Sequence, residues 1–426
     1  MTLAGIAWRY LWSRPLITVA AVTGIALGVA LISAVLTLRR ETEASLKREA
    51  GLFDLVVGAK GSPLQLVLST VYHMDVPTGN IPIERYRALK VNPQVIAAYA
   101  VGLGDNYQGF RIVGSEPNYF DMKVPKTGAK LLQFAEGGVY KEPFDVVLGA
   151  SVAAQTGLKI GGTFAGTHGL VSVPGSAEHS EFPYRITGIL KPSGTAQDRA
   201  IFAPLESIWR IHEAEEETHN AVKGISAAAN TGGTNTKAEG KGVRDEITAV
   251  LVQMKAPGLR LWLADEIRNG TESMPAIPMN EILRLYENVL IPMQRALLAV
   301  AALVVVVSVL TVMTTLYQAA ERRRKDIAII RTLGGRRWEV FFISVTEAML
   351  LSLIGIAFGA LLGHGGLALG GRIWQASSGI ALGAWSMDGD EVALLSIVFL
   401  CGSFAGLVPA LVSYRRSPSG DLHGGS

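Results

Sequence analysis

Cysteine is almost missing from this chain of 426 residues, which contains only Cys401. A single thiol excludes an intramolecular disulfide and any zinc site built from cysteines. Charged side chains are also scarce, at 18% of the residues, against roughly 25% in an ordinary soluble domain. This deficit argues against a wholly soluble enzyme. The net charge of +3 is too small to suggest a nucleic acid as a partner.

Phosphate-binding and catalytic motifs are lacking as well. The ATPase pattern Gly-x4-Gly-Lys-Ser/Thr does not occur, so this chain is not expected to bind ATP itself. Residues 58–62, Gly-Ala-Lys-Gly-Ser, have the wrong spacing for a phosphate loop and are interpreted as a turn. A nucleophile, a base and an orienting group in a catalytic arrangement are not recognisable either. We therefore expect neither an enzymatic activity nor a cofactor bound by this chain.

Long apolar runs are what the sequence does contain. A helix needs about 20 apolar residues to cross about 30 Å of hydrocarbon. Four stretches qualify, namely 16–38, about 296–320, about 341–362 and 392–412. They predict an α-helical multi-pass membrane protein with four transmembrane helices. A long loop, residues 41–290, separates the first span from the second.

Basic residues predict the orientation of the spans, because lysine and arginine are enriched in cytoplasmic loops. The segment between the second and third spans carries Arg322, Arg323, Arg324, Lys325, Arg331, Arg336 and Arg337. We expect this segment and both termini to be cytoplasmic. The loop 41–290 is then extracytoplasmic.

Glycines recur at four-residue spacing in three of the spans. They are Gly24 and Gly28, then Gly355, Gly359 and Gly363, then Gly402 and Gly406. Small residues on one stripe let membrane helices approach closely, so these seven predict helix packing, although glycine is also simply common in such helices. The second span has no glycine and predicts a lipid-facing or knob-like surface.

The loop 41–290 predicts a large α+β domain, because strand-like and helix-like segments alternate in it. Strands are expected at 54–57, 95–101, 110–113, 145–148, 184–190 and 247–254, and helices at 83–90, 151–156 and 259–267. Residues 213–245 have no periodic apolar pattern and predict a flexible loop. The apolar stretch 64–75 either contacts a hydrophobic cargo or packs inside the domain, and packing is the favoured interpretation.

Two helices are expected to join this domain to the membrane as a stalk. Residues 41–50 are helix-compatible, and Glu43 and Lys47 are spaced to pair along the helix. A second helix is predicted to begin at Asn280 as N-cap and to continue into the second span, with a kink at Pro292.

The cytoplasmic segment 321–340 carries a family resemblance. It contains the arginine run, an apolar helical turn with Ile327, Ile330 and Leu333, a break at Leu333-Gly334, and Glu347 early in the next span. This order resembles the permease subunits of MacB/FtsX/LolC-type ABC transporters. Residues 113–120 and 146–153 also resemble the periplasmic domain of that family.

The resemblance implies a four-span permease in the bacterial cytoplasmic membrane, paired with a cytoplasmic ATPase that holds ATP and magnesium. It also implies a second permease copy, contact with membrane lipid and a periplasmic partner protein. The ATPase-coupling residues would be Arg322, Arg323, Arg324, Ile327, Ile330, Arg331, Leu333 and Gly334. An FtsX-like regulatory subunit that controls a cell-wall hydrolase is the alternative.

The predicted organisation has six parts. They are 1–40 with the first span, the extracytoplasmic domain 41–290, the second span 291–320, the coupling segment 321–340, the third and fourth spans 341–414, and the cytoplasmic tail 415–426.

Few residues suggest a special chemistry. His212, Glu216 and His219 would share one face of a helix and are metal candidates, although a solvated acidic surface is the favoured interpretation. Glu347 and His364 lie in or near the third span, where ionisable groups are functional candidates. For Glu347 we expect a pairing with an arginine for packing or coupling, in preference to a proton relay.

Overall fold

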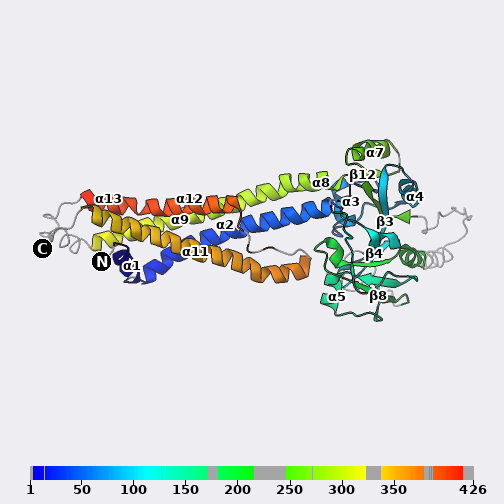
Figure 1. Ribbon diagram of the computed structural model, residues 1–426, viewed down its shortest axis with the longest axis horizontal. Helices are drawn as coiled ribbons and strands as arrows, with labels where there is room; N and C mark the ends of the chain where they lie inside the picture. Colours follow the sequence, from blue (N-terminus) through cyan, green and yellow to red (C-terminus); the bar gives the residue numbers. More distant parts are fainter. Residues whose placement is uncertain are drawn as a thin grey trace, which may run out of the picture. The chain divides into compact units, whose positions relative to one another are not determined.

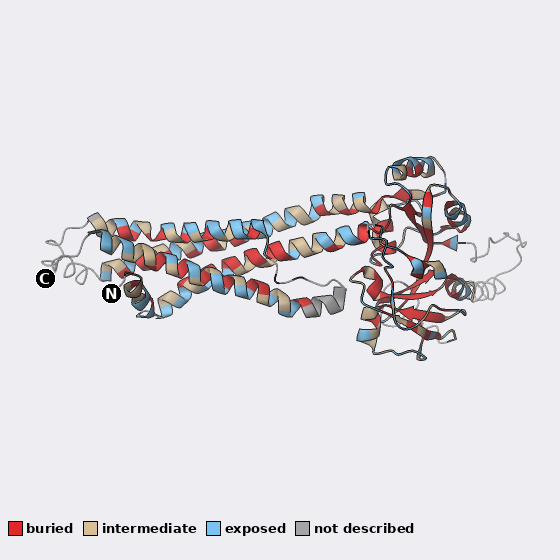
Figure 2. Ribbon diagram, viewed as in Figure 1, coloured by how far each residue is buried: buried red, intermediate tan, exposed pale blue. Residues whose placement is uncertain are grey.

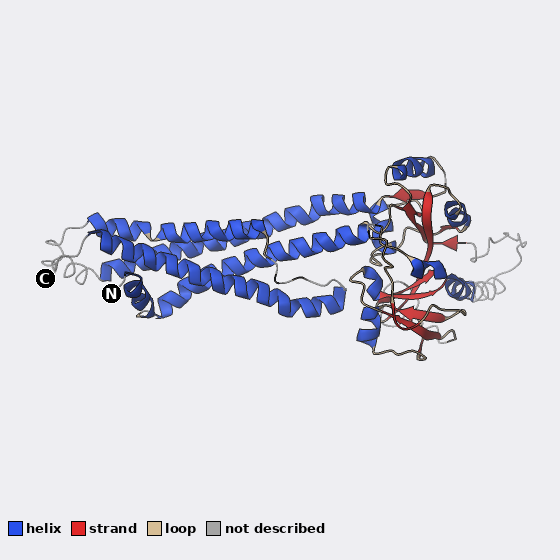
Figure 3. Cartoon of the chain, in the orientation of Figure 1, coloured by secondary structure: helices blue, strands red, loops and turns tan. Residues whose placement is uncertain are grey.

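A computed structural model describes residues 3–13, 15–125, 127–167, 169, 181–214, 246–270, 272–322, 337–378, 383, 385 and 387–415. The chain divides into two compact units. Met1–Thr42, Asn288–Ile373 and Leu382–Ser426 form the first, here named the helical unit. Glu43–Glu287 and Trp374–Ala381 form the second, named the sheet unit because every described strand belongs to it (Figure 3).

The helical unit holds the candidate membrane spans. Its helices are α1 (Leu3–Trp12), the first part of α2 (Pro15–Ala50), α9 (Ile291–Arg322), α11 (Arg337–Ser378), α12 (Gly389–Ala405) and α13 (Leu407–Arg415) (Figure 1). Four helical stretches in the described part of the chain are long and apolar enough to cross a membrane. They coincide with the four spans that the apolar runs predict, so the predicted fold class is confirmed.

Several predicted helix bounds are wrong. Helix α11, which contains the predicted third span, does not end near Leu362 but continues to Ser378. Residues 337–340, assigned to the coupling segment, already belong to this helix. The stalk helix α8 (Pro278–Leu285) has Ile277 as its N-cap, and Asn280 lies inside the helix. Proline is pre-organised for the first helical position, which explains the earlier start.

Two further bounds differ for local reasons. Residues Tyr286–Leu290 form a π-helical turn between α8 and α9, so the irregularity comes just before Pro292. Proline has no N–H to donate to the preceding turn, and the wider turn accommodates this. Glu213 and Ala214 are helical, whereas the rest of the predicted flexible loop, 215–245, lies outside the described residues. In the predicted tail, Arg415 still belongs to α13, and 416–426 lie outside the described residues.

The sheet unit is built on a ten-stranded mixed sheet with the order β12-β1-β11-β3-β4-β9-β6-β8-β5, in which β7 pairs with β8. The strands are β1 (Leu55–Gly58), β3 (Val95–Tyr107), β4 (Phe110–Ser115), β5 (Phe134–Gly137), β6 (Asp145–Leu148), β7 (Thr163–Phe164), β8 (Tyr184–Leu190), β9 (Ala200–Pro204), β11 (Ala249–Met254) and β12 (Met274–Ala276). The pairs β4–β9 and β6–β8 are parallel, and the other pairs are antiparallel. A short ribbon, β2 (Ile81–Pro82) with β10 (Glu246–Ile247), stands apart.

Burial explains the strand sequences. All residues of β1, β4, β6 and β11 are buried, and these strands are correspondingly rich in valine and isoleucine. Strand β8 alternates buried residues with more exposed ones, as expected when only one face is covered. The hairpin β3–β4 turns at Gln108-Gly109, both with positive φ, which is the geometry of a two-residue turn.

Short helices cover the sheet. They are α3 (Pro63–Thr70), α4 (Glu84–Lys90), α5 (Ala150–Thr156), α7 (Leu259–Arg268) and α8, and residues 205–214 are helical too. Figure 2 shows the strands as mostly buried. Helix α3 contributes Leu66 and Val67 to the core, so the apolar stretch 64–75 packs inside the unit. Ser62 accepts a hydrogen bond from the Gln65 N–H and caps α3, which accounts for the predicted turn at 58–62.

Candidate functional site

The predicted coupling residues fall mostly outside the described chain. Arg322 is described, and it is an exposed residue at the end of α9. The others, Arg323, Arg324, Ile327, Ile330, Arg331, Leu333 and Gly334, lie outside the described residues. The geometry of the site therefore comes from the helices on either side and from the stalk.

Glycines of α2 face α9. A Cβ on Gly24 would lie 2.8 Å from Ser308 Oγ, and one on Gly28 would lie 2.7 Å from a methyl group of Val305. The glycine-free span thus supplies the knobs that fill the spaces left by glycines of the first span. Close approach of this kind brings backbones and side chains into dispersion contact, which stabilises helix pairs in lipid.

The other five glycines lie at contacts of α11. A Cβ on Gly355 would meet Ile25, and Cβ atoms on Gly359 and Gly363 would lie 2.7 and 2.9 Å from backbone oxygens of α2. Gly402 of α12 faces Ser352, and a Cβ on Gly406 would lie 2.6 Å from the Ala348 Cβ. Helix α11 therefore packs on α2 through its own glycines, and the glycines of the last span pack against α11.

Two ionisable side chains of α11 are buried in the helical unit. Glu347 is 6% exposed and lines a small cavity together with Tyr10, Thr18 and Thr315. His364 lies with its Nε2 2.9 Å from Oε1 of Glu391, and both side chains are at most 4% exposed. Glu391 is in the first turn of α12, where a helix favours negative charge. The sequence analysis singled out Glu347 and His364 of α11 but not Glu391.

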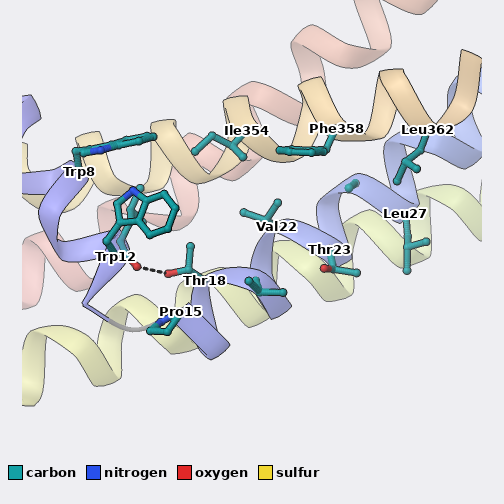
Figure 4. A pocket seen from close by; sticks show the side chains of 13 residues that line it. Trp8, Trp12, Pro15, Thr18, Val22, Thr23, Leu27, Ile354, Phe358 and Leu362 are labelled. Carbon is teal, nitrogen blue, oxygen red and sulfur yellow. Dashed lines mark hydrogen bonds between the residues drawn. The ribbon is translucent and has the colours of Figure 1, made fainter. Parts of the chain in front are cut away.

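An apolar groove of about 590 Å³ runs between α1, α2 and α11 (Figure 4). Trp8 and Trp12 line one end, Phe358 and Leu362 lie at the other, and the rings of the two tryptophans meet edge to face. Thr18 Oγ1 donates a 2.9 Å hydrogen bond to the Leu11 carbonyl and ties α1 to α2. The sequence reasoning missed α1 because ten residues are too few to register as an apolar run.

The stalk helices are joined within the sheet unit. Tyr286 Oη donates a 2.6 Å hydrogen bond to Oε2 of Glu43, which connects the π turn to α2. Glu43 also pairs with Lys47 one turn later, as the spacing predicts. The Tyr72 hydroxyl donates to the Leu46 carbonyl at 2.6 Å. The last turns of α2 are thus held from two sides.

The end of α2 also binds a loop before β9. Glu49 is 4% exposed, and its Oε1 accepts a hydrogen bond from the Ala196 N–H. The loop 193–198 is shaped by Asp198, which accepts hydrogen bonds from the N–H groups of Ser193 and Gly194. Glu49 lies beyond the apolar run that ends at Leu38, and burial in the sheet unit raises the pKa of its carboxyl to about 8.

A second buried polar group lies beside this loop. Gln197 Oε1 accepts hydrogen bonds from the Tyr119 hydroxyl at 2.9 Å and faces His73 Nε2 at 3.0 Å. Burial is the main reason why the pKa of His73 is lowered from 6.5 to about 4; the hydrogen bond with Gln197 opposes this shift and the charge of Arg111 adds to it, so the ring is neutral. Sequence reasoning could not find these residues, because they come from segments far apart in the chain.

Of the metal candidates, the structure describes only His212, which lies on the helical segment 205–214 next to Gly104 of β3. Glu216 and His219 lie outside the described residues. Within the described ranges no three His, Cys, Asp or Glu side chains are grouped as metal ligands.

Two family profiles match this chain. The MacB-like periplasmic core domain matches residues 18–244, which is more than half of the chain, and the FtsX-like permease C-terminal region matches residues 298–418. Together with the four candidate spans, these matches indicate a membrane protein with an extracytoplasmic domain, the sheet unit.

Individual proteins are similar as well. An uncharacterized ABC transporter permease of Mycobacterium tuberculosis is 24% identical over 84% of this chain, and one of Methanocaldococcus jannaschii is 26% identical over 36% of it. The matched regions span only 36% and 39% of these two relatives.

Two solved structures are also similar. The periplasmic region of MacB from Actinobacillus actinomycetemcomitans has 11% identity and a TM-score of 0.32, with 56% of this chain and 95% of that one covered. The extracellular domain of the transporter YknZ from Gram-positive bacteria has 12% identity and a TM-score of 0.27, with 52% and 98% covered. On the strength of the profile that spans more than half of its length, the chain belongs to the ABC transporter permeases of MacB/FtsX type.

Proposed function

We propose that this permease couples ATP hydrolysis by a separate cytoplasmic ATPase to movement of the sheet unit, for export or release of a substrate at the outer face of the membrane. The observation that carries the proposal is helix α2. It is one uninterrupted helix from Pro15 to Ala50, it contains the first apolar run, and its last turns are bound in the sheet unit through Leu46 and Glu49. A continuous helix transmits a displacement along its length.

The segment between α9 and α11 is the proposed contact with the ATPase. Its apolar residues Ile327, Ile330 and Leu333 recur at helical spacing, which suits insertion into a groove of a partner. The arginines beside them suit acidic residues of that partner or lipid head groups. ATP and magnesium would be bound by the ATPase and not by this chain.

The arrangement in the cell follows from the same reasoning. We place the chain in the bacterial cytoplasmic membrane with both termini and the arginine-rich segment inside. A second permease copy would complete the membrane part, as the family resemblance implies. A periplasmic protein would receive the substrate from the sheet unit.

The coupling contact can be tested by co-purification from native membranes. The double substitution Ile330→Asp and Leu333→Asp should abolish association with the ATPase, because buried apolar contacts are replaced by charge. Thr332→Asp is the matched control, since helical spacing would place this residue away from Ile330 and Leu333. Unchanged association of the double variant would remove the coupling proposal.

The identity of the partners separates transport from regulation. Co-purification of an ATPase whose activity rises with an added substrate supports transport. Recovery of the ATPase together with a cell-wall hydrolase, without a stimulating substrate, would support the FtsX-like regulatory function instead.

A further inference from the structure

The contact between Glu49 and Ala196 joins two parts of the sheet unit that are 147 residues apart in the chain. Glu49 is in the last turn of α2, and Ala196 begins the short helical turn Ala196–Arg199 that leads into β9. Strand β9 is the strand that connects β4 to β6 in the middle of the sheet. Leu46 and Ala50 also pack in the core, and the chain continues from α2 into β1, so Glu49 is one of several connections and the one that reaches the loop before β9 directly.

The surroundings of Glu49 are buried and polar. Its second oxygen, Oε2, is buried and has no hydrogen-bond partner among the residues that the structure describes. Asp198 disfavours the ionised carboxyl, whereas the Ala196 N–H and Arg48 favour it, and burial outweighs both. The buried hydroxyls of Tyr72 and Tyr119 also lie within its electrostatic reach. An ionised carboxylate is poorly compensated in this place.

We propose that Glu49, in its neutral protonated form, is the positioning residue that seats the end of α2 on the loop 193–198 and passes the movement of α2 to the sheet. This inference rests on the proposed function and names the contact through which it works. A neutral carboxyl keeps a carbonyl oxygen for the Ala196 N–H and places no charge in the buried site. Removing the side chain leaves that N–H buried without an acceptor, which destabilises the contact between α2 and the loop 193–198.

The sign of the pH dependence follows from linkage. Burial raises the pKa of Glu49 from 4.5 to about 8, so the seated state holds a proton that an unseated, hydrated carboxyl would release. The contact between Glu49 and the loop 193–198 is therefore most stable at low pH and weakens as the pH rises toward about 8. Glutamine at position 49 imitates the protonated acid and should remove this dependence.

The experiment measures amide hydrogen exchange in the full chain assembled with its ATPase in lipid nanodiscs, with and without ATP. In Glu49→Ala, exchange of the segment 193–199 should rise about tenfold or more, corresponding to the loss of one buried hydrogen bond. The ATP-dependent change in exchange should disappear at 193–199 and persist at β1, which follows α2 directly in the chain. In Glu49→Gln, the ATP response should remain, and exchange at 193–199 should be no faster than in the natural chain, because glutamine needs no proton. This exchange should no longer increase between pH 7 and 9 beyond the intrinsic rate.

Glu84→Ala is the matched control, because this glutamate of the sheet unit is 61% exposed. Unchanged exchange at 193–199 in Glu49→Ala would show that Glu49 does not hold the loop 193–198 and would overturn the proposal. Faster exchange there with an intact ATP response would overturn the role in transmission. If the natural chain shows no ATP response at all, while Glu49→Ala still loosens 193–199, the proposed function is what fails. A loss of both readouts in Glu49→Gln would show that the carboxyl must be charged and would overturn the neutral form.

Discussion

The two units of this permease are stabilised by opposite kinds of residue. In the helical unit the contacts between helices are made where side chains are smallest, at glycines that face Ser308, Val305 and Val29. In the sheet unit the core is made where side chains are largest, with Tyr119, Phe120 and Phe202 packed ring against ring. Lipid offers little hydrophobic drive between helices, whereas water drives aromatic side chains into a core. The two units should therefore fail under opposite substitutions.

The largest effect is expected from truncation in the aromatic core. Phe202 is fully buried, and its ring centroid lies 5.3 Å from that of Tyr119. Phe202→Ala should lower the free energy of unfolding of the sheet unit by about 3–5 kcal/mol. Chemical denaturation followed by tyrosine and tryptophan fluorescence measures this. Trp262→Ala, at a side chain that is 56% exposed, is the control and should change little.

A smaller effect is expected from acid, through His73. Its pKa is about 4 in the folded protein and 6.5 when exposed, so the unfolded chain binds the proton more readily. The contribution of His73 to the free energy of unfolding is therefore fully present above pH 6.5. It is lost as the pH falls toward 4, by about 3 kcal/mol at most. The measurement compares unfolding of the natural chain and of His73→Asn at pH 7 and pH 4.5. Equal acid sensitivity of the two proteins would contradict the assignment.

The opposite substitution should harm the helical unit. A Cβ on Gly359 would lie 2.6 Å from Val29 and 2.7 Å from the Ala26 carbonyl oxygen, so Gly359→Leu forces α11 away from α2. Overpacking of this kind destabilises by about 1–3 kcal/mol. Thermal unfolding in detergent measures it. Gly365→Leu on the same helix is the matched control, because no atom lies within 4 Å of its Cβ position. Equal melting temperatures would disprove the contact.

The smallest effect is expected on the stalk surface. Lys47 pairs with Glu43 one helical turn away, and the lysine side chain is 45% exposed. Lys47→Ala should destabilise by only about 0.3–0.5 kcal/mol, because exposed pairs are screened by water. A double-mutant cycle with Glu43→Gln in low and high salt measures it. A coupling above about 1 kcal/mol would mean that the pair is shielded from solvent.

Composition predicted the four spans because the preference of a helix for lipid over water is the sum of the preferences of its residues, which the sequence shows directly. Helix α11, which contains the predicted third span, continues beyond Leu362 to Ser378 through Gly363, Gly365, Gly366 and Gly370. Glycine weakens a helix in water but is frequent in membrane helices.

The side-chain contacts of the candidate site were harder to predict from the sequence. The Glu43–Lys47 pair was predictable because both residues lie on one helix. The partner of Glu49 was not, since the eight strands β1 to β8 lie between the two residues in the chain, and the partner of His364, Glu391, lies on another helix. The glycine spacings indicated which faces pack but not which helix each face would meet.

The sequence by itself determined which four stretches are apolar enough to cross a membrane and where a large α+β unit lies between the first two of them. These properties depend on local chemistry, on the length of apolar runs and on their period. Only the tertiary structure decided that α9 fills the glycine spaces of α2, that Glu391 meets His364, and that Glu49 seats α2 on the loop before β9. Such pairings join segments that are distant in the chain, and no local pattern in either segment specifies the other.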